Sequence, residues 1–461
     1  MLTLLPVSHW LSIHGLMVAM GLLIYVLTTH SLQQRRAPTA AISWVLTIAL
    51  LPYVGLPLYL LFGTRKLVRA KTRIVANSSR PDSGSIQDWP RQLAASMNQP
   101  PVASYQKLHI HAGGKQALQA LWDTIDSAKS DLVVCTFILA GDTVGRQLIT
   151  RLIEKARSGV RIRLQIDGVG YLMGGWVNLN KLKGANVRVA LHGPILHLPF
   201  KSSTNMRNHR KMVVADGKRL WCGGRNFAAE YFEGVPKHKA WEDLTFDLEG
   251  ALAAQSRALF DQDWATSTGT PTPEAMKPEP SASAAFAQVI ASGPDQADDT
   301  VHDILVTACF KASNRIMAVT PYFVPGDALL MALSLAARRG VMVDLVLPKR
   351  SNHHMADFAR HRALRHLAAS GGRVWLVPYM LHAKAVVIDD CLALAGSANL
   401  DSRSLFLNYE LMVAFYACAD VQLFADFVEQ HRKLADRYHG KKPGLWRDLA
   451  EGIVLWLAFQ L

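Results

Sequence analysis

The sequence contains one eight-residue pattern twice, and this duplication predicts a chain built from two similar halves. Each copy consists of His, one residue, Lys, four residues and Asp, and the copies comprise His209, Lys211 and Asp216, and His382, Lys384 and Asp389. In both copies an asparagine follows the histidine by seventeen residues, at Asn226 and Asn399. A matched offset of this length indicates that whole folding units, and not only short motifs, are repeated.

The segments before the two motifs also resemble each other. An apolar run at Leu132–Leu139 leads through a helical stretch to a second apolar run ending at Ile166, and Ile316–Val324 leads in the same way to Leu347. Strand, helix and strand in this order are typical of a parallel or mixed sheet. We therefore expect an α/β fold with two halves packed against one another around one shared active site.

The paired motifs favour chemistry at a phosphodiester. Each histidine and its lysine lie two residues apart, so both side chains point to the same face of a strand. One histidine can attack phosphorus and form a phosphohistidine, and the other can protonate the departing oxygen and then deprotonate the incoming alcohol. Two lysines and two amides can neutralise the phosphate oxygens. The motifs thus predict phosphodiester exchange without a metal ion or a cofactor.

Two long uncharged stretches lie at the N-terminus. No Asp, Glu, Lys or Arg occurs before Arg35, and none occurs between Ala37 and Thr64. Each stretch exceeds the roughly 20 apolar residues that cross a bilayer, so we expect a hairpin of two transmembrane helices, near 10–29 and 42–62, the second kinked at its prolines. A cleaved signal peptide followed by a core helix is the alternative, although the first residues lack a positively charged region.

The charges around this hairpin predict its orientation. Arg35 and Arg36 lie between the two stretches, and a denser group follows the second stretch, comprising Arg65, Lys66, Arg69, Lys71 and Arg73. Because cytoplasmic segments carry the excess of Lys and Arg, the denser group is expected in the cytosol. Two spans would then place the N-terminus and the catalytic part on the same, cytosolic side.

The composition limits the kinds of partner. Among 461 residues, 50 are Lys or Arg and 36 are Asp or Glu, which gives a formal net charge of +14. Half of the residues are hydrophobic and 19% are charged, which excludes an intrinsically disordered chain. The basic surface favours an anionic partner, either nucleic acid or anionic lipid. The five cysteines are scattered without a close pair, so no structural zinc site is expected.

The two motifs resemble the HxKxxxxD motifs of the phospholipase D superfamily. With its apolar hairpin, basic segment and apolar C-terminal tail, the chain is similar over nearly its whole length to the bacterial cardiolipin synthases of that superfamily. The segments 320–325, 399–405 and 408–410 are similar to stretches typical of this group.

This resemblance implies roles for individual residues. His209 is expected as the nucleophile and His382 as the general acid and base. The residues expected to bind the phosphoryl oxygens are Lys211, Lys384, Asn226, Ser397 and Asn399. In the family a downstream carboxylate holds the second ring nitrogen of each histidine and fixes its tautomer. Glu410 matches that position in the second half and Asp243 in the first.

Two features of the motifs depart from a simple catalytic assignment. Asp216 and Asp389 are counted with the catalytic set as motif residues, but a structural role at the end of the strand fits them better. Gly224 stands where the superfamily usually has Ser, so the first half lacks one hydroxyl near the phosphate. A lost neutral hydrogen bond is worth about 1 kcal/mol, which predicts asymmetry between the halves and not a loss of activity.

We expect six segments along the chain. They are 1–75 for the hairpin and basic segment, 76–104 for a tether, 105–267 for the first half, 268–290 for a Pro-rich linker, 291–440 for the second half and 441–461 for an apolar segment at the membrane interface. A helix docked on the second half is the alternative for the last segment.

The reaction implied by the resemblance is transfer of a phosphatidyl group from one phosphatidylglycerol to another, with release of glycerol. The implied partners are phosphatidylglycerol, other anionic phospholipids and the membrane, and no nucleic acid is expected. The expected location is the bacterial cytoplasmic membrane, as a multi-pass protein with two spans and with the catalytic part facing the cytosol. The alternatives are a hydrolase, a transferase that uses another donor such as phosphatidylethanolamine, a nuclease of the same superfamily and a non-catalytic scaffold for anionic lipids. Two bilayer spans argue against the nuclease.

Overall fold

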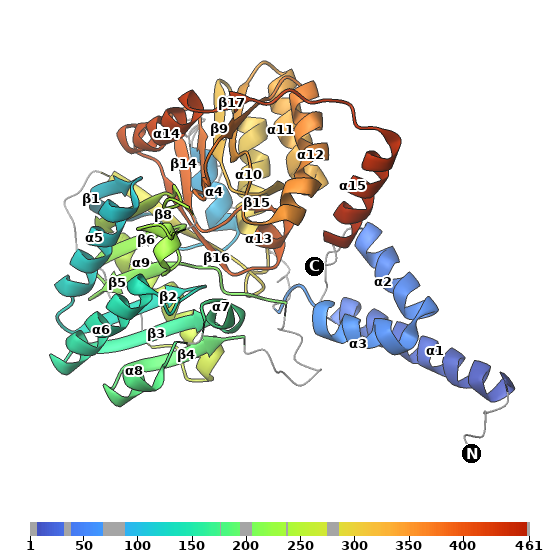
Figure 1. The fold of residues 1–461 in the computed structure, drawn as a ribbon, viewed down its shortest axis with the longest axis horizontal. Helices are drawn as coiled ribbons and strands as arrows, with labels where there is room; N and C mark the ends of the chain where they lie inside the picture. Colours follow the sequence, from blue (N-terminus) through green and yellow to red (C-terminus); the bar gives the residue numbers. More distant parts are fainter. Residues whose placement is uncertain are drawn as a thin grey trace, which may run out of the picture.

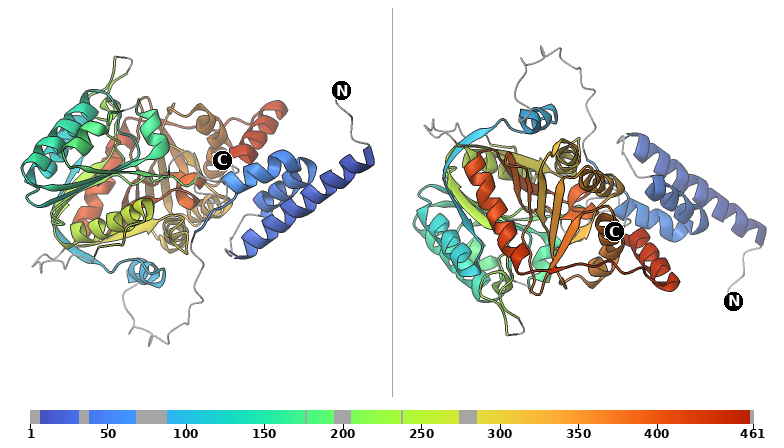
Figure 2. Two further views of the ribbon diagram at one scale, coloured as in Figure 1. Left: turned by 90° about the horizontal axis from the view of Figure 1, so that it is seen from below. Right: turned by 90° about the horizontal axis from the view of Figure 1, so that it is seen from above.

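The computed structural model describes residues 7–31, 38–67, 88–175, 177–193, 205–236, 238–273 and 285–458. Two α/β halves lie side by side, and three N-terminal helices project from one side of them (Figures 1 and 2). The C-terminal helix lies on the same side as these helices. The prediction of an α/β fold with two similar halves is confirmed.

In its described residues, the first half contains seven strands and the helices that cover them. Its strands are β1 (Ala103–His111), β2 (Asp131–Thr136), β3 (Arg161–Asp167), β4 (Arg188–His192), β5 (Met212–Ala215), β6 (Arg219–Gly223) and β7 (Thr245–Glu249). Its helices are α5 (Gly114–Ser127), α6 (Thr143–Arg157), α7 (Gly168–Met173), α8 (Asn180–Gly184), the short η2 (Ala229–Tyr231) and α9 (Ala251–Thr268).

The second half repeats this series with additions. Its strands are β8 (Ala285–Ser292), β9 (Arg315–Val319), β10 (Phe323–Val324), β11 (Met342–Pro348), β12 (Arg373–Val377), β13 (Ala385–Ile388), β14 (Leu392–Gly396), β15 (Leu400–Asp401), β16 (Glu410–Phe415) and β17 (Asp436–Arg437). Its helices are α10 (Thr300–Lys311), α11 (Asp327–Arg338), α12 (His354–Ala369), α13 (Ser402–Phe406) and α14 (Cys418–Lys433).

Both halves have the same strand order. The first half runs β1-β7-β6-β5-β2-β3-β4, and the second runs β8-β16-β14-β13-β9-β11-β12 with β17 at its edge. In each half the last three strands of the repeated order are parallel and the other pairs are antiparallel. Antiparallel pairing of β1 with β8 joins the halves into one 15-stranded sheet.

The motif strands are buried on both faces, which explains their continuous apolar sequence. On β5, Met212 and Val214 belong to a core that both halves share, whereas Val213 and Ala215 belong to a core of the first half alone. The alternation follows from the two-residue period of a strand. It is repeated on β13, whose alternate residues face the shared core and the second half's own core.

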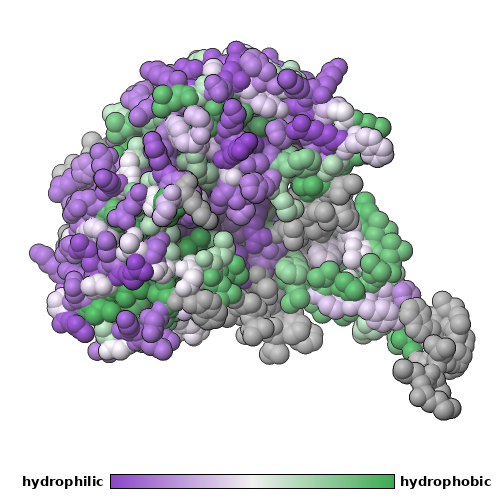
Figure 3. Space-filling view, in the orientation of Figure 1, coloured by the Kyte–Doolittle hydropathy of each residue, from purple (hydrophilic) through white to green (hydrophobic). Residues whose placement is uncertain are grey.

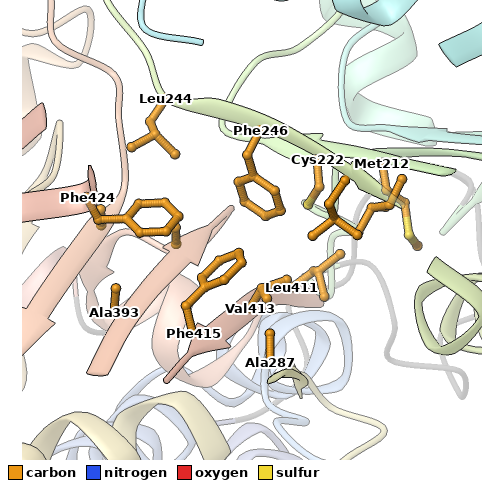
Figure 4. Packing of buried hydrophobic residues seen from close by; sticks show 14 of the residues in the cluster. Met212, Cys222, Leu244, Phe246, Ala287, Ala393, Leu411, Val413, Phe415 and Phe424 are labelled. Atoms are coloured by element: carbon orange, nitrogen blue, oxygen red, sulfur yellow. The ribbon is translucent and has the colours of Figure 1, made fainter. Parts of the chain in front are cut away.

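Aromatic packing closes the shared core between the halves. The ring centroids of Phe246 and Phe415 lie 5.3 Å apart, and those of Phe415 and Phe424 lie 4.7 Å apart. Figure 4 shows these rings meeting between β7, β16 and α14. Because these strands and α14 come from both halves, neither half buries this core by itself.

The N-terminal region contains α1 (Val7–Ser31), α2 (Pro38–Leu50) and α3 (Pro52–Phe62). The predicted second span is therefore not one helix, since the chain breaks at Leu51 (φ −134°, ψ 60°). Proline disfavours helical geometry at the preceding residue and has no N–H to continue the helix. Within the described residues, one helix, over Ser12–His30, is long and apolar enough to cross a membrane. The prediction of two spans is wrong on this point.

Residues 63–67, which we call the strap, connect α3 to the second half. Arg65 and Lys66 both form ion pairs with Asp299, at 2.7 and 3.0 Å. Lys66 is buried and also donates a hydrogen bond to the carbonyl oxygen of Gly293 at 3.0 Å. The strap thus holds the N-terminal helices against the second half. Arg35, Arg36, Arg69, Lys71 and Arg73, on which the predicted orientation also relied, lie outside the described residues.

Helices and strands also occupy parts of the expected linkers. Helix α4 (Trp89–Ser96) falls within the expected tether 76–104, and its Ala94 is fully buried in the second half's core. Strand β8 begins at Ala285, inside the expected linker 268–290. The apolar face of α4 and the pairing of β8 with β16 account for this order. The remaining parts, 76–87 and 274–284, lie outside the described residues.

Helix α15 (Leu445–Ala458) occupies the C-terminal segment and docks on α12 of the second half. Its fully buried Glu451 forms an ion pair with Arg365 at 2.5 Å. Leu445 and Trp446 remain 72% and 83% exposed. The alternative prediction, a helix docked on the second half, therefore holds for the side of α15 that faces α12. Leu445 and Trp446 are exposed and do not take part in this packing.

Candidate active site

The backbone brings the two motifs together at the junction of the halves. The N–H of His209, just before β5, donates to the carbonyl oxygen of Tyr409 at 2.9 Å. In the equivalent contact, the N–H of His382, just before β13, donates to Glu242 at 2.6 Å. Each contact lies in a short parallel bridge between the halves. Each histidine is thus positioned by a segment of the opposite half.

Because of these bridges, the carboxylate of each half lies beside the histidine of the other half. Nδ1 of His209 lies 3.0 Å from a carboxylate oxygen of Glu410, which follows Tyr409. Nδ1 of His382 lies 2.7 Å from Asp243, which follows Glu242. The structure therefore places both expected carboxylates at histidines, and each contacts the histidine of the other half.

The carboxylates determine the histidine tautomer. Burial would raise the pKa of both carboxyls, but in Glu410 the neighbouring His209 and Lys211 lower it, and in Asp243 the neighbouring Lys384 and His382 do the same. Ionised carboxylates only accept hydrogen bonds, so each histidine carries its proton on Nδ1. Nε2 of each ring then carries the lone pair, which in His382 accepts a hydrogen bond from Nζ of Lys384.

Burial lowers the pKa of both histidines. The value falls to about 4 for His209 and to about 3 for His382, and the nearby lysines add to the decrease. Both rings are therefore neutral at pH 7. Lys384 contributes to the shift of His209, and Lys211 to that of His382, so the four groups form one electrostatic cluster across the junction.

The two lysines place two buried amines in the cluster. Nζ of Lys211 donates to the carbonyl oxygen of His209 at 2.6 Å, and Nζ of Lys384 donates to Nε2 of His382 at 3.0 Å. Burial lowers the pKa of Lys384 to about 8, and it lowers that of Lys211 well below its usual value. An anion bound between the amines would remove this penalty, because it supplies the opposite charge.

The asparagines are held by hydroxyl groups that the sequence analysis did not identify. Nδ2 of Asn226 donates to the hydroxyl of Tyr231 at 2.8 Å, and Nδ2 of Asn399 donates to the hydroxyl of Ser404 at 3.2 Å. In both halves the hydroxyl follows the asparagine by five residues. This matched spacing is the signal in the sequence that could have identified them. An amide nitrogen has two N–H groups, so one remains for a ligand.

Ser397 and Gly224 occupy equivalent places with different surroundings. The Ser397 hydroxyl is fully buried and donates to Glu410 at 2.5 Å. At Gly224 a Cβ would lie only 2.3 Å from a carboxylate oxygen of Asp243. The shorter Asp243 side chain thus fills the space that a serine would need. Ser397 was expected at the phosphate, but its hydroxyl contacts the carboxylate instead.

Aromatic rings surround the histidines. Phe137 lies edge-on to His209 with centroids 5.3 Å apart, and Tyr231 and Trp241 lie 5.2 and 5.6 Å from His382. Rings of this kind exclude water and lower the local polarity. They come from segments that precede or follow the motifs, with Tyr231 at the end of η2, so the motif spacing did not reveal them.

Asp216 and Asp389 lie at turns with positive φ, 51° and 48°. The Asp216 carboxylate accepts hydrogen bonds from the backbone N–H groups of 129–131, and Asp389 accepts them from 313–315. Each carboxylate therefore ties the motif strand to the start of β2 or β9, in agreement with the structural role considered for it.

Comparison with known proteins identifies the family. Residues 121–264 and 305–432 match the family model described as cardiolipin synthase, phospholipase D-like domain, and residues 18–63 match the phospholipase D-nuclease N-terminal model. The chain is 30% identical to cardiolipin synthase A of Pseudomonas aeruginosa over 90% of this chain and 89% of that protein. It is also 30% identical to cardiolipin synthase A of Klebsiella pneumoniae, with 98% of each chain covered.

A solved structure supports the fold. The crystal structure of phosphatidylserine synthase from Haemophilus influenzae superimposes with a TM-score of 0.62 at 13% identity, covering 81% of this chain and 98% of that one. The repeated sheet, the two matched domains and the relatives along the whole chain agree. The chain belongs to the cardiolipin synthase family of the phospholipase D superfamily and is a membrane-associated phosphatidyltransferase.

Proposed function

We propose that this protein makes cardiolipin from two molecules of phosphatidylglycerol through a phosphohistidine intermediate. The observation that carries the proposal is the crossed pair of histidine–carboxylate contacts, with two buried lysines beside them. This arrangement supplies an Nε2 lone pair on each ring, that of His382 in contact with Lys384, and two buried amines within one cluster. A phosphodiester monoanion is the ligand that suits it.

In the first step, Nε2 of His209 attacks the phosphorus of one phosphatidylglycerol. The N–P bond forms while the bond from phosphorus to the glycerol oxygen breaks, and His382 gives that oxygen a proton. The bound phosphate anion offsets the charge of Lys211 and Lys384 and raises the pKa of His382, so this ring takes up a proton on Nε2 as the substrate binds and then gives it to the leaving oxygen. Lys211, Lys384 and the free N–H groups of Asn226 and Asn399 hold the phosphoryl oxygens.

In the second step, the terminal hydroxyl of another phosphatidylglycerol attacks phosphorus. His382 accepts the hydroxyl proton, the N–P bond breaks, and cardiolipin leaves with His209 restored. Transfer must be faster than hydrolysis, so water has to be kept from the intermediate. The aromatic residues beside the histidines, Phe137, Tyr231 and Trp241, support this exclusion.

The exposed fractions support the division of labour between the histidines. The side chain of His209 is 14% exposed and that of His382 is 5% exposed. In addition, Lys384 already donates to Nε2 of His382. A nucleophile has to meet a lipid phosphorus, which favours the more open ring, whereas an acid and base needs only proton exchange.

Lipid product analysis tests the reaction. The purified protein is incubated with vesicles of phosphatidylglycerol alone, and the expected products are cardiolipin and free glycerol in equal amounts. Phosphatidic acid as the main product would instead show a hydrolase. Cardiolipin formed only after phosphatidylethanolamine is added would overturn the proposed donor.

Two variants control this experiment. His382→Ala should form neither product at the wild-type rate, while His439→Ala, which removes an exposed histidine outside the site, should match the wild type. Equal activity of His382→Ala and wild type would contradict the proposed mechanism.

A further inference from the structure

The short helices α2 and α3 form a hairpin that lies along α1. Its turn is beside the first part of α1, since the rings of His14 and Tyr53 lie 5.9 Å apart. Its open end is beside the last part of α1, where Tyr25 lies 5.2 Å from Tyr59 and the hydroxyl of Thr28 lies 2.5 Å from that of Tyr59. The start of α2 and the end of α3 therefore lie at the same end of α1.

Contacts within the hairpin agree with this arrangement. Trp44 and Tyr59, seven and eight residues on either side of Leu51, pack with ring centroids 5.3 Å apart. Nearer the turn, a Cβ on Gly55 would lie 2.7 Å from the carbonyl oxygen of Thr47. Glycine at this position allows the two backbones to approach closely. Because both contacts join residues at similar distances before and after Leu51, α2 and α3 run antiparallel.

Neither short helix can cross a bilayer alone. A helix rises 1.5 Å per residue, so the 25 residues of α1 reach about 37 Å, whereas the 13 of α2 and the 11 of α3 reach about 20 and 16 Å. The hydrocarbon core is roughly 30 Å thick. Only α1 has the necessary length among these three helices, and the hairpin ends within the membrane if it enters beside α1.

The turn of the hairpin is suited to an apolar environment. Leu51 donates its N–H to Thr47 at 2.9 Å and accepts at its carbonyl from Val54 and Gly55 at 3.0 and 2.7 Å. Pro52 has no N–H that would need a partner. A break in a helix is tolerated in lipid only when its backbone polar groups are paired, and at this break both backbone groups of Leu51 have partners.

The side chains at the turn are apolar and exposed. Leu50, Leu51 and Val54 are 70%, 59% and 54% exposed. Figure 3 shows hydrophobic residues among the N-terminal helices, in contrast with the mainly hydrophilic surface of the two halves. Lipid chains are the partner that such a surface fits.

We propose that α1 crosses the membrane once and that α2 and α3 form a re-entrant hairpin, so that the first residues of α1 face the outer side and both halves face the cytosol. All seven basic residues near the helices then share one side, because Arg35 and Arg36 follow α1 and the other five follow α3. Residues 1–34 contain no Lys or Arg. With the proposed topology, seven basic residues lie on the cytosolic side and none on the outer side, in agreement with the positive-inside rule. A hairpin of two spans would instead place five of them inside and two outside. This topology does not depend on the proposed reaction.

Labelling of single cysteines tests the topology. Cys418 is exposed on the second half and reports the side of the catalytic part, in a Cys391→Ser background. Thr3→Cys and Gln33→Cys are made with Cys418→Ser added, which leaves the buried cysteines in place. Spheroplasts and inverted membrane vesicles are treated with a maleimide that does not cross membranes.

The topology predicts that Thr3→Cys reacts in spheroplasts, whereas Gln33→Cys and Cys418 react only in inverted vesicles. Reaction of Gln33→Cys in spheroplasts, with Thr3→Cys and Cys418 on the other side, would establish two spans and overturn the proposal. Release of the protein by an alkaline wash would overturn it as well.

Trypsin treatment provides a second test on the unmodified protein. Trypsin cleaves after Lys and Arg, and the proposed topology places all of these residues inside. The chain should therefore remain whole in spheroplasts and be cut in inverted vesicles. Cleavage after Arg35 or Arg36 in intact spheroplasts would contradict the re-entrant hairpin, whatever the effect of the cysteine substitutions.

Discussion

The two histidines have the same backbone setting but different support. His209 meets the longer carboxylate Glu410, which is also held by the Ser397 hydroxyl at 2.5 Å. His382 meets the shorter carboxylate Asp243, which lies where a side chain on residue 224 would be. The histidine–carboxylate contact is thus the same in both halves, but the residues around it differ. This difference suits two steps in which one ring forms a bond to phosphorus and the other moves a proton.

Removing either histidine should give the largest effects and separate their roles. His209→Ala should abolish the covalent phosphatidyl-enzyme, because it removes the Nε2 atom that bonds to phosphorus. His382→Ala should lower turnover by roughly 10²–10⁴-fold, the usual contribution of general acid–base catalysis, while His209 remains able to react. Rapid quenching with labelled phosphatidylglycerol, followed by peptide mapping, measures the adduct. An adduct on His382 would reverse the roles.

Neutralising the carboxylates should lower kcat less than removing a histidine does, and it tests whether each carboxylate acts on the histidine of the other half. Glu410→Gln and Asp243→Asn remove the charge that fixes the Nδ1–H tautomer, and each should lower kcat on the order of 10²-fold. Nuclear magnetic resonance of the ring nitrogens would show which histidine responds. Because the contacts cross, Glu410→Gln should perturb His209 and Asp243→Asn should perturb His382. The opposite pattern would contradict the geometry.

The sequence predicted which residues form the site better than which of them contact each other. The repeated motifs predicted two α/β halves, and both carboxylates were identified as partners of the histidines. Their crossing could not be predicted, because it depends on bridges such as that between Asn208 and Tyr409, which join residues far apart in the chain. The prediction of a second span was wrong for a local reason, the helix break before Pro52. Hydrophobicity measures the apolar content of a segment and not whether it forms one continuous helix.

Substitutions at positions 224 and 397 should sharpen the difference between the halves. Ser397→Ala removes one hydrogen bond to a carboxylate and should reduce kcat about tenfold. Gly224→Ser introduces the residue usual in the superfamily, yet it should also reduce kcat because its Cβ would displace Asp243. Steady-state rates on phosphatidylglycerol vesicles measure both. An increase in activity for Gly224→Ser would show that Asp243 can move without cost.

The pH dependence should report Lys384, whose pKa is lowered to about 8 by burial. The amine is charged below that pH and neutral above it, so its attraction for the phosphate is lost as the pH rises. The free enzyme governs kcat/KM, which should fall from about pH 8 upwards, by roughly tenfold per pH unit at most. Lys384→Arg keeps the charge and should remove this decrease, although its overall rate is lower. An unchanged decrease would assign it to another group.

The smallest catalytic effect is expected at Asp216 and Asp389, where the halves are most alike. Each carboxylate accepts three backbone hydrogen bonds at a turn of positive φ. Asp216→Ala should therefore lower the free energy of unfolding by about 2 kcal/mol and leave kcat within about twofold of the wild type, as far as the protein stays folded. Asp216→Asn should recover part of the stability, because asparagine tolerates this backbone and keeps one acceptor. Thermal unfolding compared with rates at low temperature separates the two effects. A loss of kcat in a stable Asp216→Asn protein would give the aspartate a catalytic role, and the same result at Asp389 would extend that role to both motifs.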